Sequence, residues 1–195
     1  MRICSDSIGI TTIKSATIRV QIKTKQMITS TINFKQWIED NRELLKPPVG
    51  NKAIYNEDFI VMVVGGPNSR KDYHLNQTAE FFYQIEGDIV LKVIDNGEAK
   101  DIHIKEGEVF FLPPNIPHSP QRGPNTVGLV IEQKRAEGMD DGLAWFCEKC
   151  HNELHREPFK LVNIETDMPV LFDKYYSNEA LRTCDKCGTT MEPPK

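Results

Sequence analysis

Two histidines and one glutamate in this sequence have the types and setting of metal ligands. His74 lies six residues before Glu80 in a strand-like stretch, and His118 follows the proline-rich turn "PPNIP". Antiparallel strands can turn three such side chains inward at one level of a barrel. Two neutral imidazoles and one carboxylate leave coordination positions open, which suits non-haem Fe(II) and oxygen chemistry. We therefore predict that these three side chains bind a catalytic metal ion.

Four of the five cysteines form a second candidate metal site. They lie in two C-x-x-C pairs, Cys147 with Cys150 and Cys184 with Cys187, whereas Cys4 stands apart. Four thiolates complete a tetrahedral site with no open position, and their softness accepts iron or zinc. We predict a structural metal site; a role in electron transfer is the alternative. Unpaired thiols also favour a reducing, cytoplasmic compartment.

Composition and charge limit the class of partner and the organisation of the chain. The chain has 195 residues, a net charge of -4 and a pI near 5.8, which argue against nucleic-acid or anionic-membrane partners. It has no run of about 18 apolar residues, so no membrane span is expected. We divide it into an N-terminal extension without functional role over residues 1–26, a catalytic barrel with a preceding helix over 27–134, and a cysteine-bearing tail over 135–195. The acid-poor extension fits a transit peptide only loosely, and we prefer a poorly ordered extension or an upstream start.

The segments around the candidate ligands predict an all-β-dominated protein with a few short helices. Residues 33–46 predict an amphipathic helix capped by Asn33. Short apolar runs separated by Gly, Pro and Asn follow over residues 59–132 and predict a sandwich or small barrel. Within them, residues 88–105 predict a hairpin with a two-residue Asn-Gly turn. The tail reads as a strand and then a helix before the second cysteine pair.

Two motifs carry a resemblance to a known superfamily. The stretch "GGPNSRKDYHLNQTAEFFYQIEG" resembles the first cupin motif, and "GEVFFLPPNIPHSPQR" resembles the second. There are two departures: Asp72 replaces the usual first histidine, and Asn115 replaces a glycine. Asn115 can adopt the left-handed backbone that the turn requires. Asp72 leaves a ligand set of two histidines and one glutamate; it either orients a neighbouring side chain or lies exposed.

Further stretches narrow the resemblance to one family. Together with "LVIE" and the two C-x-x-C pairs, the motifs resemble the bacterial form of the 3-hydroxyanthranilate 3,4-dioxygenase family, from Asn33 to the C-terminus. The resemblance implies a cupin barrel, that is, a double-stranded β-helix or jelly roll, with a metal-bound C-terminal tail. It also implies opening of the ring of 3-hydroxyanthranilate by O2 to give 2-amino-3-carboxymuconate semialdehyde. That product cyclises to quinolinate, a precursor of NAD in the kynurenine pathway.

The resemblance also assigns cofactors and residue roles. It implies Fe(II) on His74, Glu80 and His118, and a second iron or zinc on the four cysteines. Arg70 and Arg122 match the family's substrate-binding arginines, whose planar guanidinium suits a carboxylate. Glu132 matches a glutamate that faces the substrate and could accept its proton. A cytoplasmic homodimer is expected from the same resemblance.

Three other interpretations stay open at this point. The protein could be another metal-dependent cupin enzyme acting on a small aromatic carboxylate, with a different metal and no use of O2. It could be a ligand-binding or storage cupin without chemistry, although Arg70, Arg122 and Glu132 around an open-faced site count against that. Third, the protein could be a zinc-ribbon interaction module in which the barrel is only a scaffold. The acidic composition argues against nucleic acid as the partner of such a module.

Overall fold

The computed structural model describes residues 28–47, 50–160 and 164–194, so the extension over residues 1–26, with Cys4, lies outside the described residues. Asn33–Lys195 forms one compact unit. Its elements are α1 (Phe34–Asn41), η1 (Arg42–Leu45), β1 (Asn51–Asn56), β2 (Phe59–Gly65), β3 (Asp72–Leu75), β4 (Glu80–Glu86), β5 (Ile89–Asp95), β6 (Glu98–Ile104), β7 (Val109–Leu112), β8 (His118–Arg122), β9 (Val127–Gln133), β10 (Asp141–Phe146), β11 (Glu153–Phe159), α2 (Ile164–Tyr176) and α3 (Glu179–Arg182).

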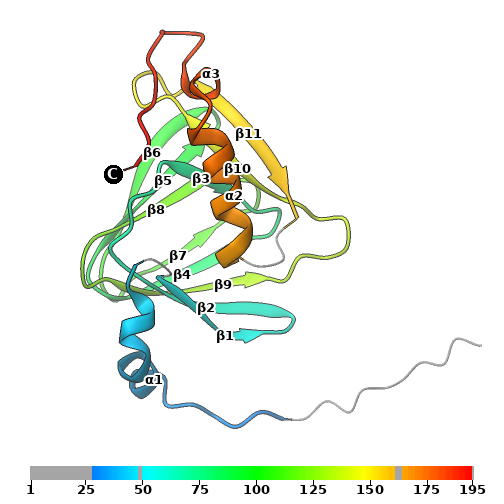
Figure 1. Ribbon diagram of the computed structural model, residues 1–195. Helices are drawn as coiled ribbons and strands as arrows, with labels where there is room; N and C mark the ends of the chain where they lie inside the picture. Colours follow the sequence, from blue (N-terminus) through cyan, green and yellow to red (C-terminus); the bar gives the residue numbers. More distant parts are fainter. Residues whose placement is uncertain (1–27, 48–49, 161–163, 195) are drawn as a thin grey trace, which may run out of the picture. The chain divides into compact units, whose positions relative to one another are not determined.

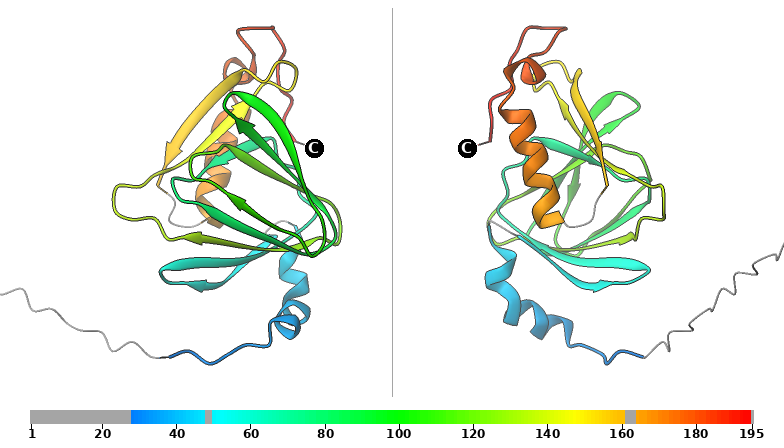
Figure 2. Two further views of the ribbon diagram at one scale, coloured as in Figure 1. Left: turned by 180° about the vertical axis from the view of Figure 1, so that it is seen from behind. Right: turned by 45° about the vertical axis from the view of Figure 1, so that its right-hand side comes forward.

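The described strands pair into two antiparallel sheets that form the walls of a barrel (Figures 1 and 2). One sheet has the order β1-β2-β9-β4-β7, and the other has the order β11-β10-β3-β8-β5-β6. Strands that are consecutive in sequence often fall in different sheets, as expected of a jelly roll. The prediction of an all-β-dominated cupin barrel with a few short helices is confirmed.

The main hydrophobic core lies between the two sheets. Phe82 and Val130 of the first sheet pack with Leu91, Val93 and Ile104 of the second, and each is at most 5% exposed. These residues alternate along their strands with side chains that point outward, because successive side chains of a strand face opposite sides. The same alternation turns polar side chains of β3, β4, β8 and β9 into the barrel at neighbouring positions.

The predicted N-terminal helix exists but changes its winding. The Asn33 side chain accepts a hydrogen bond from the Gln36 N–H at 3.1 Å, as a cap should, and α1 is followed by the 3₁₀ turn η1. Ile38 and Leu45 are buried against Val63 and Val127 of the first sheet. This segment therefore packs on the core, as the apolar stripe predicted. No helix among the described residues is long and apolar enough to cross a membrane.

The turn residues behave as their chemistry predicts, whereas some of the strands were not predicted. Asn96 and Gly97 have positive φ angles of 51° and 82° between β5 and β6, and Asn115 has a φ of 64°. No strand was predicted at His118 and Arg122, directly after the proline-rich turn. Both belong to β8, which pairs with β5 through its backbone despite containing Pro120. Strand β1 was also missed, because its sequence "NKAIYN" has little apolar alternation.

The C-terminal segment contributes directly to the second sheet. Strand β10 is buried along its whole length and pairs with β3 on one side and β11 on the other. Leu143 and Trp145 are paired with His74 and Asp72, so they share one face of the sheet with them. Helix α2 covers this face (Figure 2). Trp145 stacks on Tyr175 of α2 with ring centroids 4.0 Å apart. The tail thus closes one side of the barrel.

Candidate metal centre and its surroundings

The three predicted ligands meet inside the barrel. His74 on β3 and His118 on β8 are directly opposite in register, and Glu80 begins β4. Glu80 Oε1 lies 3.6 Å from His74 Nδ1 and 3.3 Å from His118 Nε2. One ligand atom from each residue can be chosen so that all lie within 4.8 Å of one another. These separations fit a single ion with bonds of about 2.1 Å to each ligand.

The partners of both imidazoles favour metal binding. His118 Nδ1 lies 3.0 Å from the Ile116 carbonyl, and His74 Nε2 lies 2.8 Å from Asp141 Oδ2. An N–H that donates to these oxygens leaves the lone pair of the other ring nitrogen directed toward Glu80. Burial opposes protonation of His74, but Asp141 and Glu80 raise its pKa to about 9. A metal cation can take the place of that proton, so the donor set fits a divalent ion.

Two carboxylates, Glu80 and Glu132, lie opposite each other on β4 and β9 and are both 4% exposed. The buried Asn76 amide holds them together: its Nδ2 donates to Glu80 Oε1 at 3.1 Å and to Glu132 Oε2 at 2.8 Å. Burial and the neighbouring Glu80 raise the pKa of Glu132. Burial alone would also raise the pKa of Glu80, but His118 and His74 hold it well below its usual range. The two glutamates therefore differ in their affinity for a proton.

Asp72 lies buried and pairs with Arg70 through both carboxylate oxygens, with Arg70 Nε to Asp72 Oδ1 at 3.2 Å. Of the two roles left open for Asp72, the exposed one is therefore wrong. The side chain that Asp72 orients is the arginine, and among the described residues Asp72 makes no hydrogen bond to a histidine ligand. Burial opposes the charge on Arg70, but Asp72 raises its pKa overall.

Arg122 is buried and poorly partnered. Its Nη1 donates to Gln84 Oε1 at 3.3 Å, while its Nε has no hydrogen-bond partner among the described residues. Burial, and then the charge of Arg70, lower the pKa of Arg122 to about 10. Gly128 gives the guanidinium its space, because a β-carbon there would lie 2.9 Å from Arg122 Nη1 and 2.8 Å from Gln84 Oε1. A buried cation with a free donor is suited to receive an anionic ligand.

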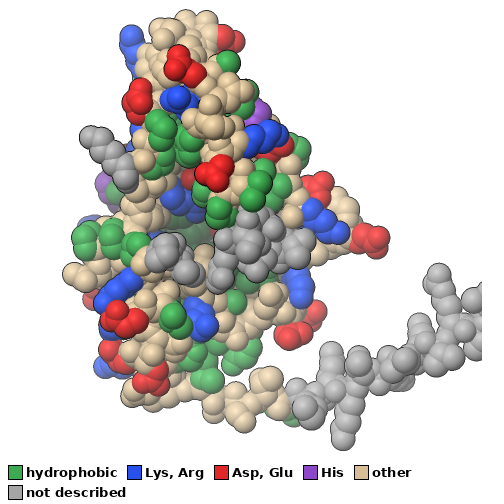
Figure 3. Space-filling view, viewed as in Figure 1, with side chains coloured by type: hydrophobic (Ala, Val, Ile, Leu, Met, Phe, Trp, Pro, Cys, Tyr) green, Lys and Arg blue, Asp and Glu red, His purple; other side chains and the backbone are tan. Residues whose placement is uncertain are grey.

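The structure thus groups all the sequence-predicted barrel residues and adds three that were missed. Asn76, Arg135 and Asp141 hydrogen-bond to the predicted ligands or to Glu132. Asn76 lies inside the first cupin motif, and its position between two ligands was an available clue. Arg135 and Asp141 lie beyond the last predicted strand, in a segment assigned to the tail, and sequence spacing gave no sign of them. Figure 3 shows the surface hollowed beside α2, with apolar and basic side chains within the hollow.

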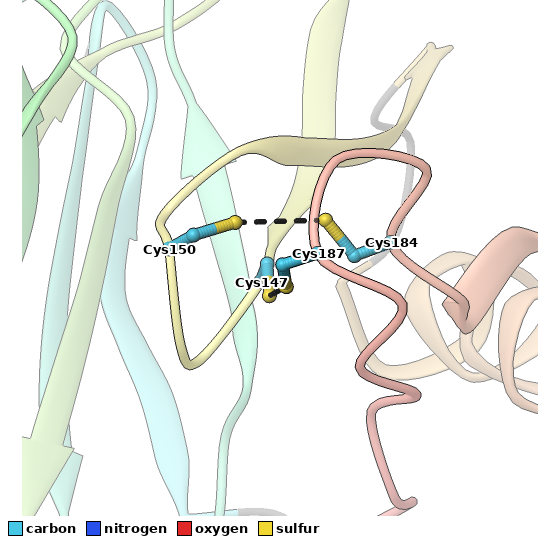
Figure 4. Close-up of side chains that lie close together, drawn as sticks. All are labelled: Cys147, Cys150, Cys184 and Cys187. Atoms are coloured by element: carbon cyan, nitrogen blue, oxygen red, sulfur yellow. Dashed lines mark hydrogen bonds between the residues drawn. The ribbon is translucent and has the colours of Figure 1, made fainter.

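The four cysteines of the tail converge as predicted (Figure 4). Cys147 Sγ lies 3.5 Å from Cys187 Sγ, and Cys150 Sγ lies 3.6 Å from Cys184 Sγ. None of the four is in a disulfide. A tetrahedron of sulfurs around one ion, with bonds of about 2.3 Å, has edges of about 3.8 Å. The thiols therefore have the spacing of a closed metal site.

Both cysteine loops have the same backbone geometry. The Cys147 and Cys184 N–H groups donate to the carbonyls of Asn152 and Thr189, and the N–H groups of His151 and Gly188 donate back to the two cysteines. His151 and Gly188 occupy equivalent positions with φ angles of 57° and 72°. The first loop thus has a histidine in the left-handed conformation where the second loop has a glycine.

The two-sheet barrel with candidate metal ligands on β3, β4 and β8 places the protein in the cupin class. Comparison with known families makes this specific, because residues 27–176 match the model of "3-hydroxyanthranilic acid dioxygenase". The chain belongs to this family.

Individual relatives agree with the family match. The 3-hydroxyanthranilate 3,4-dioxygenase of Xanthomonas euvesicatoria pv. vesicatoria is 53% identical over 87% of this chain and 96% of its own length. The enzyme of the same name from Neurospora crassa is 48% identical over 85% of this chain and 92% of its own length. Among solved structures, a cupin-2 domain protein from Shewanella frigidimarina has 21% identity and a TM-score of 0.43, covering 53% of this chain and 94% of its own.

The equivalence of the two cysteine loops predicts opposite effects of matched substitutions. Gly188→Ala should destabilise the metal-loaded protein by about 1–2 kcal/mol, because a β-carbon disfavours the left-handed backbone. The converse change, His151→Gly, should be neutral or stabilise by up to about 1 kcal/mol. Thermal unfolding followed by circular dichroism measures both. A His151→Gly loss as large as that of Gly188→Ala would show instead that the imidazole stabilises the loop.

Proposed function

We propose that this protein is an Fe(II)-dependent dioxygenase that converts 3-hydroxyanthranilate and O2 to 2-amino-3-carboxymuconate semialdehyde, the precursor of quinolinate. The observation that carries the proposal is the convergence of His74, Glu80 and His118 in a chain of the dioxygenase family, with the buried Arg122 and the half-buried Arg70 nearby. His74, Glu80 and His118 would hold the iron. When bound, Fe(II) supplies the Lewis-acid and redox chemistry by which an aminophenol and dioxygen react.

The arginines would bind and orient the substrate carboxylate. Arg122 has a free buried Nε donor, and its charge and that of Arg70 lie close enough to affect each other. A carboxylate between them would offset their mutual repulsion and supply the missing acceptor. Asp72 holds Arg70 through both of its oxygens, which fixes the plane of the guanidinium. The ring is thereby presented to the metal in one orientation.

Glu132 would accept a proton from the substrate hydroxyl or amine. Its carboxylate shares the Asn76 amide with the ligand Glu80, so it lies beside the metal site. Burial and Glu80 raise the pKa of Glu132, which makes it a better proton acceptor than an exposed glutamate. Gln84, Phe82 and Leu91 around the interior, each at most 3% exposed, help to exclude water.

The four-cysteine site would hold iron or zinc in a structural role. It joins the loop after β10 to the loop after α3, and α2 between these loops covers the face that carries His74. Ring opening takes its electrons from the substrate, so the reaction requires no external reductant. Four reduced thiols fit a cytoplasmic location.

A homodimer would use the outer face of the first sheet. Register places Phe111, Phe81, Ile131, Val61 and Tyr55 in one row across all of its strands. Phe111 is 62% exposed and the neighbouring Val109 is 60% exposed. A contiguous apolar row of this kind is typical of an interface between subunits.

Turnover tests the proposed reaction. Apo protein loaded anaerobically with Fe(II) and given 3-hydroxyanthranilate should consume O2 and form the ring-opened product when air is admitted. His74→Ala and His118→Ala should abolish both changes while the protein stays folded, because each removes a ligand. Cys184→Ser should loosen the tail but retain part of the activity. Wild-type protein that binds Fe(II) yet consumes no O2 would contradict the proposal.

Gly128→Ala tests how the carboxylate is bound. The added methyl group should displace the Arg122 guanidinium and raise KM for 3-hydroxyanthranilate about 10–100-fold, the usual effect of losing a charged hydrogen bond. Turnover of 2-aminophenol, which lacks the carboxylate, should change little. Gly123→Ala is the control, because a β-carbon there contacts nothing within 4 Å. Equal KM values for Gly128→Ala and wild type would exclude Arg122 as the carboxylate partner.

Sedimentation velocity tests the proposed interface. Phe111→Glu should convert a dimer to monomers, because it would bury a charge between the subunits. Val170→Glu on α2, also at an exposed position (67%), should leave the dimer intact. A dimer that survives Phe111→Glu would place the interface elsewhere.

A further inference from the structure

Arg135 connects two carboxylates that act at different points of the proposed mechanism. Its Nε and Nη2 donate to the two oxygens of Asp141, each at 2.6 Å, and its Nη1 lies 3.0 Å from Glu132 Oε1. Asp141 also lies 2.8 Å from His74 Nε2. A continuous series of charged hydrogen bonds and one ion pair therefore leads from the candidate ligand His74 to Glu132.

The series is buried, so its geometry is well defined. The side chains of Arg135, Asp141 and Glu132 are 9%, 0% and 4% exposed. Charged hydrogen bonds are stronger away from water, and an unpaired carboxylate there would be costly. The planar guanidinium contacts both carboxylates at once with separate nitrogens. A lysine ammonium carries the same charge but lacks this fork.

Glu132 is held from both sides. Arg135 contacts its Oε1, and Asn76 donates to its Oε2 at 2.8 Å. Asn76 also donates to the ligand Glu80, whereas Arg135 leads through Asp141 to the ligand His74. Each oxygen of Glu132 is thus tied to a different metal ligand, which fixes the carboxylate relative to the metal site.

We propose that Arg135 is a positioning residue for the reaction. It sets the place of the Glu132 carboxylate relative to the metal centre, and it does so through Asp141 and His74. This inference rests on the proposed function, in which Glu132 accepts a proton from the substrate. Asn76 provides the second tie, so replacement of Arg135 leaves Glu132 held at one oxygen and free to rotate.

The Arg135→Lys variant separates position from charge. It keeps the positive charge, so the buried carboxylates retain a counter-ion, but one ammonium cannot reproduce three directed contacts. We expect kcat for 3-hydroxyanthranilate to fall about 100-fold, as for misplacement of a catalytic group by about 1 Å. KM should stay within about threefold, because Arg70 and Arg122 are untouched. Arg156→Lys is the matched control: Arg156 makes two hydrogen bonds to Glu153 on the surface, and its replacement should change neither constant.

The same substitution made in a Glu132→Gln variant tests whether Arg135 acts through Glu132. In Glu132→Gln protein, Arg135→Lys should lower kcat by less than about threefold further, because its target is already removed. A full additional 100-fold loss would overturn the proposal. So would Arg135→Lys protein that melts at lower temperature but turns over at the wild-type rate, since that result defines a purely structural role.

Cobalt substitution gives a readout that does not depend on turnover. The d–d absorption of Co(II) bound at His74, Glu80 and His118 should shift in Arg135→Lys and in Asp141→Asn, but not in Arg156→Lys. Unchanged Co(II) spectra would overturn the connection through Asp141 to His74. If wild-type protein shows the cobalt spectrum but takes up no O2 with Fe(II), the proposed function is wrong. The connection from Arg135 through Asp141 to His74 is still tested by the cobalt spectra of the variants.

Discussion

The central constraint on this structure is the burial of three carboxylates beside two imidazoles. Glu80, Glu132 and Asp141 each lie at most 4% exposed, and unpaired charges at such depth would cost several kcal/mol each. The structure meets this cost with specific partners. The histidines face Glu80, the Arg135 guanidinium pairs with both Glu132 and Asp141, and the Asn76 amide bridges the two glutamates. The arrangement leaves a net attraction for a cation at the ligands.

The balance between burial and pairing also explains how the two arginines of the site, Arg70 and Arg122, differ. Arg70 has its own counter-ion in Asp72, whereas Arg122 has only a neutral amide and a free Nε. Burial opposes the charge on both arginines, but only Arg70 has a carboxylate that outweighs this effect, so their pKa values move in opposite directions. An anion can bind only where a positive charge is left unpaired. The two arginines therefore have different roles. Arg70 is held in place by Asp72, whereas Arg122 gains its missing acceptor from a bound ligand.

The features that could be predicted from the sequence are those set by a local pattern of residues. The turn at Asn96-Gly97, the cap at Asn33 and the left-handed Asn115 are decided within a few residues, and the structure has each of them. The ligand triad was predictable because the motif encodes strand spacing. Asp141 was not, because it reaches His74 only when β10 pairs with β3, a contact between distant segments, and Arg135 follows the end of β9 outside both motifs. Strand β8 was misread for a related reason: its backbone pairing with β5 outweighs the local preference of Pro120.

Strand β10 relates the two candidate metal sites. Asp141 at its start lies against the ligand His74, and Cys147 follows its last residue, Phe146. Six residue steps along a strand cover about 20 Å, so the two sites share no ligand and no direct hydrogen bond. They are coupled mechanically instead. The cysteines fix the end of β10 and the chain after α3, while Trp145 stacks on Tyr175 of α2 between these points. Because β10 is rigidly paired along its length, anchoring one end also fixes Asp141 at the other. A metal ion bound by the four cysteines would therefore support the geometry of the candidate ligands in the barrel without taking part in their chemistry.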